Sequence, residues 1–421
     1  MTQRRFSDYL DAEWQPALGC TEPACIAWAT SLAASQATGE IRAIRLVCDP
    51  RIYKNCYAVG IPHSGHKVGI LWALAIGGLL PDPSASLECF TQIEPETLAG
   101  AARLIESGLL HVRVDPTRTE LHVDCTVERE GGVGRALIAR DHTRLVRLER
   151  DGVRQGGDEP GPGERAPRRD MRQELARLGF EELLQLARSL EPTDRERLRE
   201  GAELNLAIAE HGLTLFPERF VQMGDRETQT RISRLVCAGV YARMWGEDFR
   251  VMSLAGSGNK GIVCAVPMTL WGRELNVAEG RIDEALALAC VVTSTTTHHL
   301  GTLSAVCGCS NAAGIGLAAG LVALEGGGPD EISLAINNMV GNVTGMVCDG
   351  AKIGCALKTM TSVDAAFRSA SLALSGIGIP VSDGIVGASG LLSLRNLGRL
   401  ATRGMVSVDQ EILAIMQEKL G

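Results

Sequence analysis

Five cysteines in the second half of the chain lie in three short stretches, two of which are rich in glycine. Cys290 stands alone, Cys307 and Cys309 are separated by one residue, and Cys348 and Cys355 are separated by six. Structural zinc favours C-x-x-C pairs, and neither gap matches that spacing. Thiolates also bind iron–sulfur clusters, whose ligands can come from separate loops. The spacing therefore leaves two main interpretations, a cluster site and a set of small core residues.

A second candidate site is the stretch SLAGSGNKGIVCAVP at residues 253–267. Ser257, Gly258, Asn259 and Lys260 precede an apolar run that predicts a helix. Backbone amides at a helix N-terminus can hold a carboxylate or phosphate group. The spacing matches neither a P-loop nor a dinucleotide-binding fingerprint. The stretch is therefore either a plain turn or a site for an anion.

A third candidate is Cys20 in the stretch PALGCTEPACIAW. The residues that follow it indicate the start of a helix at Pro23. A thiol at a helix N-terminus has a lowered pKa and can act as a base or a nucleophile. Cys25 lies further inside the same helix, where no such reason applies. Position alone thus makes Cys20 a candidate for chemistry, beside the alternative of an inert core thiol.

Length, charge and cysteine content exclude several classes of protein. At 421 residues the chain exceeds the usual size of one core, so we expect two domains. A net charge of −8 without a basic run argues against a nucleic-acid partner. The N-terminal stretch MTQRRFSDYLDAEWQP lacks the apolar segment of a secretory signal, so we expect a cytoplasmic protein. In that compartment thirteen cysteines indicate free thiols and metal ligands instead of disulfides.

Residues 303–324 nearly reach the length of a membrane span. They contain four glycines, two serines and an asparagine, and no aromatic residues mark their ends. We therefore expect closely packed buried helices here and no membrane partner. A homodimer is the expected assembly, as for many enzymes of this size.

The chain divides at residues 151–170, which are rich in Gly, Pro and charge and predict a linker or long loop. Residues 1–150 combine antiparallel strands with helices at 23–37 and 95–108. Residues 171–421 are helical almost throughout and rich in Gly, Ala and Ser, so we expect the active centre there. The predicted fold class is α+β, an N-terminal α+β domain followed by a mostly α-helical, Gly-rich catalytic domain. The expected strands are 41–49, 109–115, 121–128, 136–141 and 144–150.

Six motifs, taken together and in this order, resemble the L-cysteine desulfidase family, within the iron–sulfur L-serine dehydratase superfamily. They extend over nearly the whole chain, which makes a chance resemblance improbable. The motifs are GCTEPA (19–24), GIPHSG (60–65), AGSGNKG (255–261), CGCSNAAG (307–314), GNVTGMVCDGAKIGCALK (341–358) and LRNLGRLATRGM (394–405).

The resemblance implies a [4Fe–4S] cluster held by three cysteines, with Cys348 and Cys355 as two of the ligands. The third ligand lies in CGCSNAAG, where Cys309 matches the family's motif better than Cys307. Cys20 matches the family's proposed catalytic base, which implies a site between the two domains.

For the substrate, the resemblance implies an amino acid whose carboxylate binds the AGSGN loop. Ser257, Gly258 and Asn259 are the candidates there, together with the backbone amides of the loop.

The implied reaction is a β-elimination without pyridoxal phosphate. Three protein ligands leave one iron open, so the cluster would serve as a Lewis acid. L-Cysteine would then give pyruvate, ammonia and sulfide; the alternatives are L-serine dehydration and a non-catalytic iron–sulfur protein. The chain ends in MQEKLG, without the terminal cysteine of the serine dehydratases, and GCTEP replaces their Ser/His-rich motif. Both differences favour cysteine over serine as the substrate.

Overall fold

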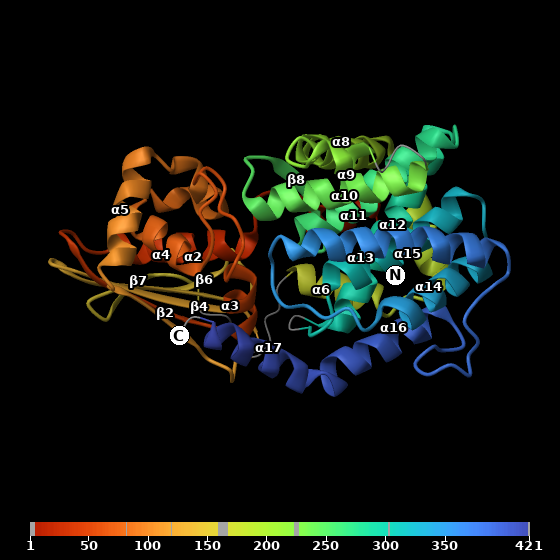
Figure 1. The fold of residues 1–421 in the computed structure, drawn as a ribbon. Coiled ribbons are helices and arrows are strands. Elements are labelled where there is room, and N and C mark those ends of the chain that lie inside the picture. The colour runs from red at the N-terminus through yellow and green to blue at the C-terminus, as the bar shows by residue number, and fades with distance from the viewer. Residues whose placement is uncertain are drawn as a thin grey trace.

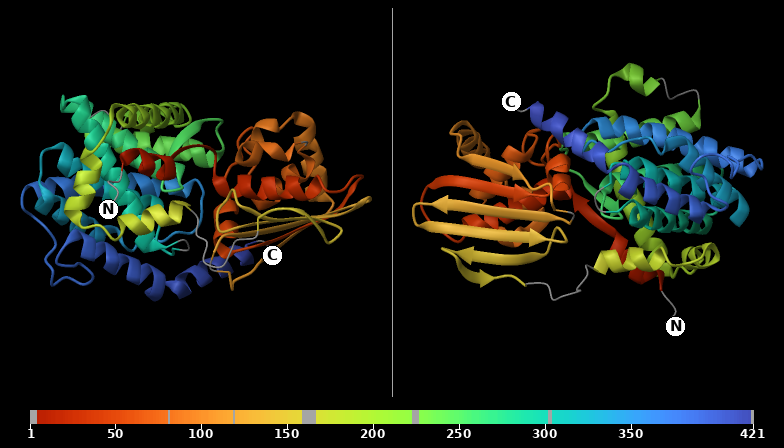
Figure 2. Two further views of the ribbon diagram at one scale, coloured as in Figure 1. Left: turned by 180° about the vertical axis from the view of Figure 1, so that it is seen from behind. Right: turned by 90° about the horizontal axis from the view of Figure 1, so that it is seen from below.

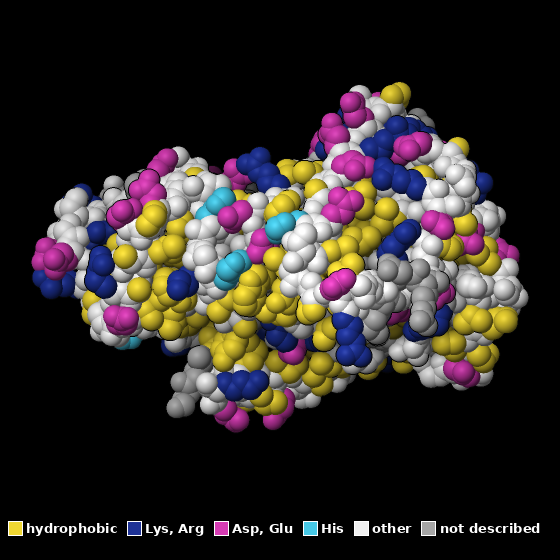
Figure 3. Space-filling model, turned by 45° about the horizontal axis from the view of Figure 1, so that its top comes forward, with side chains coloured by type: hydrophobic (Ala, Val, Ile, Leu, Met, Phe, Trp, Pro, Cys, Tyr) yellow, Lys and Arg dark blue, Asp and Glu magenta, His cyan; other side chains and the backbone are white. Residues whose placement is uncertain are grey.

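The computed structural model describes residues 5–80, 82–118, 120–158, 167–222, 227–301 and 304–419. Figure 1 shows an α+β part and a helical part. Buried side chains form two hydrophobic cores, one in each part. The predicted α+β fold class is confirmed. On the face shown in Figure 3, acidic and basic side chains are interspersed without a large field of one sign.

The α+β part contains a six-stranded sheet with the strand order β3-β2-β4-β5-β6-β7. Neighbouring strands are antiparallel except β2 and β3, which run parallel. The expectation of antiparallel pairing is wrong for this pair, because the helices between the two strands form a crossover that returns the chain in the same direction. The strands are β2 (Ile41–Cys48), β3 (Leu110–Val114), β4 (His122–Arg129), β5 (Gly132–Ala139), β6 (Leu145–Arg150) and β7 (Val153–Gly156).

Helices cover one face of this sheet (Figure 1). The two predicted helices are present, the first beginning two residues before the expected Pro23. Gly77 allows its helix to approach the first one closely, since a Cβ there would lie 2.3 Å from the carbonyl oxygen of Ala27. The helices are α2 (Thr21–Ala34), α3 (Pro50–Cys56), α4 (Ile70–Leu79), η1 (Pro83–Gln92) and α5 (Pro95–Glu106).

The helical part is built around α13 (Gly308–Leu324), which is almost entirely buried. Among the described residues no single helix is long and apolar enough to cross a membrane, although the bent pair α4 and η1 would suffice together by length and composition. The other helices are α6 (Pro167–Leu175), α7 (Phe180–Arg188), α8 (Pro192–Leu213), α9 (Glu218–Gln222), α10 (Thr228–Trp245), α11 (Gly258–Glu274), α12 (Glu279–Leu300), α14 (Pro329–Val343), α15 (Gly354–Leu374), α16 (Gly390–Arg399) and the π-helix η2 (Leu400–Gly404).

Both ends of the chain connect the two cores. Helix α1 (Phe6–Glu13) packs in the helical core, and the following β1 (Trp14–Leu18) pairs antiparallel with β8 (Arg250–Leu254). Helix α17 (Val406–Glu418) follows the helical part, yet it places two side chains in the core of the α+β part (Figure 2). Neither connection is predicted by the sequence. The domain boundary at residues 151–170 stays a prediction, and residues 159–166 lie outside the described part.

Helix α17 is held on the α+β part by an ion pair between Asp409 and Lys54 of α3. The Lys54 side chain is 4% exposed, so its ammonium group has little access to water. Removing the partner of a buried donor costs about 1–3 kcal/mol. The pair is therefore the main polar contact that keeps this helix docked.

We predict that Asp409→Asn releases α17 from the α+β part. Hydrogen exchange of the amides in residues 406–418 should become faster in this variant, with little change in α13. Glu411→Gln, on an exposed position of the same helix, is the matched control and should exchange like the wild type. Unchanged exchange in Asp409→Asn would show that the apolar contacts alone hold the helix.

Candidate active site

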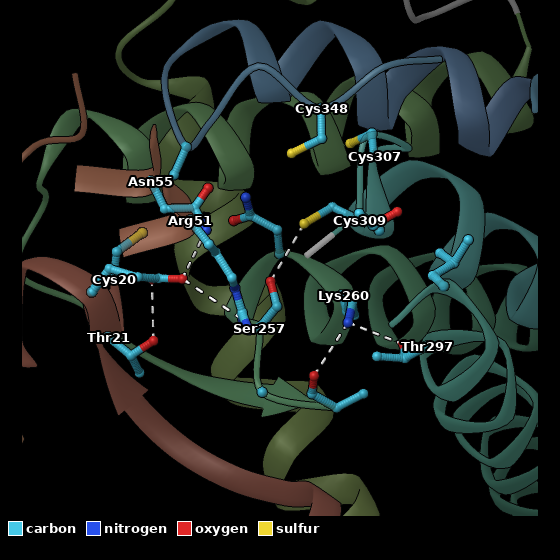
Figure 4. Close-up of a pocket in the computed structure, with 18 of the residues that line it drawn as sticks. Cys20, Thr21, Arg51, Asn55, Ser257, Lys260, Thr297, Cys307, Cys309 and Cys348 are labelled. Atoms are coloured by element: carbon cyan, nitrogen blue, oxygen red, sulfur yellow. Dashed lines mark hydrogen bonds and ion pairs between the residues drawn. The ribbon is translucent and has the colours of Figure 1, made fainter. Parts of the chain in front are cut away.

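A cavity of about 370 Å³ lies between the two parts of the molecule. The α+β part contributes the start of α2 and residues of α3, and the helical part contributes the loop after β8 and the starts of α13 and α15 (Figure 4). Six of the seven predicted site residues line the cavity, and Gly258 does not. The six are Cys20, Ser257, Asn259, Cys309, Cys348 and Cys355, and Cys307 lines the cavity as well.

Backbone hydrogen bonds bring two of the thiol-bearing loops together. The amide of Cys307 donates to the carbonyl of Met346 at 2.9 Å, and the amide of Cys348 donates to the carbonyl of Ala305 at 2.7 Å. The side chain of Asn311 donates to the carbonyl of Cys307 and so fixes the same turn. This pairing of residues 305–307 with 346–348 places Cys307 and Cys348 side by side, although 40 residues separate them in sequence.

Helix starts position the remaining thiols. Cys307 is the N-cap of α13, which carries Cys309 in its first turn, and Cys355 lies in the first turn of α15. The sulfur atoms of Cys307, Cys309 and Cys348 point toward the same space in Figure 4. Cys290, in contrast, is buried in α12 and does not line the cavity. Its inclusion among the candidate thiols is not supported.

The clustered thiols influence one another's protonation. Interaction with the thiol of Cys307 raises the pKa of Cys348 well above its ordinary value, and burial raises that of Cys355 to about 12. A hydrogen bond from Cys307 lowers the pKa of Cys309, against the effect of burial. Thiols that oppose one another's ionisation become thiolates together only if a cation binds among them.

This donor set fits an iron–sulfur cluster better than a single ion. Within the described ranges no three His, Cys, Asp or Glu side chains are arranged to hold one metal ion. A cluster takes one cysteine per iron, so its thiolate ligands stand further apart than those of one ion and can come from separate loops. The half-buried thiols of Cys309 and Cys348 and the buried thiol of Cys355 come from three separate helix or loop starts and line one cavity, which meets that requirement.

Cys20 lies on the α+β side of the same cavity. It is the N-cap of α2 with extended backbone angles, as the sequence predicts, and its residue is 3% exposed. Gly19 before it has φ +65°, and a Cβ at that position would lie 2.5 Å from the side chain of Pro62. Only glycine fits this turn, which directs Cys20 into the junction between the two parts.

The environment of Cys20 differs from the expected one. Burial raises the pKa of its thiol to about 11, which outweighs the charge of Arg243 that lowers it. The expectation that the start of the helix would give a net lowering is therefore not met, because desolvation of the thiolate is the larger effect. A reactive Cys20 depends on the cation beside it.

The AGSGN loop (residues 255–259) lines one side of the cavity. Ser257 is the N-cap of α11, and its hydroxyl lies 3.4 Å from the sulfur of Cys309. Asn259 is buried and accepts a hydrogen bond from Arg243, so its amide oxygen already has a partner. Gly258 packs against the guanidinium of Arg243, because a Cβ there would lie 2.4 Å from Nε. A role of these residues toward a substrate carboxylate stays a prediction.

Charged side chains of both signs surround the cavity, and sequence reasoning did not assign them. The ammonium of Lys260 donates to the carbonyl of Ala255 and the hydroxyl of Thr297, and burial lowers the pKa of Lys260 to about 8. Glu22 accepts from Asn55 at 3.0 Å. Lys260 lies in the AGSGNKG motif and Glu22 in the GCTEPA motif, so these motifs are the sequence feature that could have identified both residues as part of the site.

Glu22 is the buried anion of this set. Burial favours its neutral form, but the charges of His142 and Arg51 outweigh this and hold the pKa of Glu22 below its ordinary value. The Arg51 guanidinium lies 4.0 Å from the carboxylate. His142 and Arg51 come from parts of the chain without a motif, so only the fold reveals them.

Comparison with known proteins gives one family match and many relatives. The family described as serine dehydratase alpha chain matches residues 169–414. A UPF0597 protein of Geobacter sulfurreducens is 38% identical over 98% of both chains. UPF0597 proteins of Desulfatibacillum aliphaticivorans and Clostridium botulinum are 34% and 31% identical, over 98% and 99% of both chains respectively. The names of these UPF0597 relatives specify no substrate.

We predict that replacing cluster ligands lowers the iron content of the protein, whereas replacing the other thiols does not. Cys348→Ala, Cys355→Ala and Cys309→Ala should each lose most of the iron of anaerobically purified protein, because each removes a ligand. Cys307→Ala should retain it, with buried Cys25→Ala as the control. Iron retained in Cys309→Ala but lost in Cys307→Ala would exchange the roles of these two residues.

Proposed function

Because this chain belongs to the serine dehydratase alpha-chain family, whose members are iron–sulfur lyases, we propose that it eliminates sulfide from L-cysteine. The products would be pyruvate, ammonia and sulfide. The observation that carries this proposal is the cavity in which Cys20 of one part faces the clustered thiols of the other. Serine dehydration is the second candidate, and the family match favours it.

The charges around the cavity suit an amino-acid substrate. A zwitterion carries an ammonium and a carboxylate, and the cavity offers the buried carboxylate of Glu22 and the cations Arg51 and Lys260. The amides and hydroxyl of the loop at Ser257 would hold the substrate carboxylate at the start of α11. Binding both charged groups orients the Cα–H bond and the β-substituent within the cavity.

Cys309, Cys348 and Cys355 are the residues that would hold a [4Fe–4S] cluster. With these three cysteines as ligands one iron would have no protein ligand, and the group would supply a Lewis acid for the departing sulfur. Ser257, at 3.4 Å from the sulfur of Cys309, lies where substrate and ligands would meet.

Cys20 would remove the proton from Cα. As its thiolate accepts that proton, the electron pair of the C–H bond forms the Cα–Cβ double bond and the C–S bond breaks, so the sulfur leaves with its electron pair. The remaining aminoacrylate tautomerises to an imine, and water converts the imine to pyruvate and ammonia. The chemistry needs no pyridoxal phosphate, since the leaving group departs as the proton is removed.

The substrate is tested with anaerobically purified protein. We predict that L-cysteine gives pyruvate and sulfide faster than L-serine gives pyruvate, measured at equal concentrations of the two amino acids. Faster turnover of serine would make the protein a dehydratase. Absence of activity on both, in protein that contains iron and sulfide, would contradict the proposed reaction.

The role of Cys20 is tested by Cys20→Ala. The variant should keep its iron while turnover falls by roughly 10²- to 10⁴-fold, the usual contribution of a positioned base. Cys56→Ala, a neighbouring buried thiol outside the cavity lining, serves as the control and should retain activity. A Cys20→Ala variant that turns over at the wild-type rate would exclude the thiol as the base.

A further inference from the structure

Arg243 is a buried arginine of α10 at the junction of the two parts, with a residue exposure of 4%. Its guanidinium donates to the carbonyl of Gly19 at 2.6 Å and to the amide oxygen of Asn259 at 3.0 Å. Its Nε is buried without a hydrogen-bond partner. Both recorded acceptors are neutral, and no ion pair with Asp or Glu is found for it among the described side chains. A buried cation with only neutral partners is costly unless an anion compensates it.

The Glu22 carboxylate interacts with Arg243 through its charge but forms no ion-pair contact with it among the described side chains, and the thiol of Cys20, next to the Gly19 carbonyl that accepts from Arg243, is a second group that can become an anion. Burial raises the pKa of this thiol, and the positive charge of the Arg243 guanidinium opposes that effect and favours the thiolate. The Glu22 carboxylate on α2 opposes the ionisation of this thiol. The Cys56 thiol on α3 also interacts with Cys20, which raises the pKa of Cys56. Arg243 is thus the cation that faces Cys20.

The surroundings of Arg243 are shaped to hold its guanidinium at this point. Gly258 leaves room for the side chain, since a Cβ there would lie 2.4 Å from Nε and 2.8 Å from Cζ. The amide oxygen of Asn259 accepts from one end, and the carbonyl of Gly19, the residue next to Cys20, accepts from the other. The AGSGN loop of the helical part therefore positions a cation against the α+β part.

We propose that Arg243 is a positioning residue that forms an ion pair with the Cys20 thiolate and thereby makes Cys20 reactive. The reactive thiol belongs to the α+β part and its counter-ion to the helical part, so reactivity requires both parts to be docked. The proposal deepens the proposed function, in which Cys20 removes a proton. The ion pair itself can be measured without any substrate.

The test is the alkylation rate of Cys20 by iodoacetamide in the full chain, purified anaerobically, as a function of pH. Cys20 and Cys25 lie in one tryptic peptide, residues 6–42, so fragment ions compare both thiols in each sample. In the wild type Cys20 should react much faster than the fully buried Cys25 at pH 8. Arg243→Met should slow Cys20 by about tenfold or more at this pH, since one pKa unit changes the thiolate fraction tenfold. The curve of the Cys20 alkylation rate against pH should shift to higher pH in this variant, because the pKa of the thiol rises.

Two further variants distinguish the effect of the Arg243 charge on the Cys20 alkylation rate from the effect of a change in packing. Arg243→Lys keeps a cation and should leave the Cys20 rate within a few-fold of the wild type. Arg231→Met, on the same helix with an exposed side chain, is the matched control and should change nothing. If Arg243→Met fails to fold, Arg243→Lys and the wild-type comparison of Cys20 with Cys25 still decide the question.

The proposal is overturned if Arg243→Met alkylates at the wild-type rate, or if Arg243→Lys is slowed as much as a variant without the charge. It is also overturned if wild-type Cys20 reacts no faster than Cys25. Because alkylation uses no amino-acid substrate, a protein that lacks lyase activity can still pass this test. A failed alkylation test, in turn, leaves the lyase assay unaffected.

Discussion

The backbone pairing of residues 305–307 with 346–348 is the interaction on which the site depends. Two amide-to-carbonyl hydrogen bonds, from Cys307 to Met346 and from Cys348 to Ala305, join loops that enter two different helices. Helices α13 and α15 then leave this point in fixed directions and pack against each other in the helical core. The thiols stand where two well-packed helices begin, so their positions are set by the core and not by flexible loops.

The opposite wall of the cavity is set by the contact between the two cores. Gly19, with its positive φ, turns the chain so that Cys20 caps α2 at that boundary. The strand pair β1 and β8 connects the first residues to the helical part, and α17 returns from the helical part to the α+β part. The cavity therefore lies between two parts that the chain ties together at both ends. This arrangement lets buried charges such as Arg243 act across the boundary, where water cannot screen them well.

The sequence predicts the local features of this site and misses those that depend on tertiary contacts. Alternation of apolar and polar residues indicates β4 and β6 within one residue at each end, although β5 begins four residues before the expected 136. The GCTEP stretch locates the start of α2 within two residues. The parallel pairing of β2 and β3 and the strand pair β1 and β8 escape prediction, because both join segments that are distant in sequence. The same holds for Cys20: the helix start is local and visible, whereas the desolvation that raises its pKa comes from the packed cores. Arg243 lies in an ordinary helical stretch, and only the fold brings it to the thiol.

In the proposed reaction, an iron with an open position, held among the clustered thiols, would bind the substrate opposite Cys20. Mössbauer spectra of anaerobically purified, iron-57-labelled protein, recorded with and without saturating L-cysteine, can detect this binding. We expect the substrate to change the signal of one iron in the cluster and to leave the others nearly unaltered. A spectrum that is the same with and without L-cysteine or L-serine would contradict it, because a cluster with every iron held by the protein has no position for a substrate.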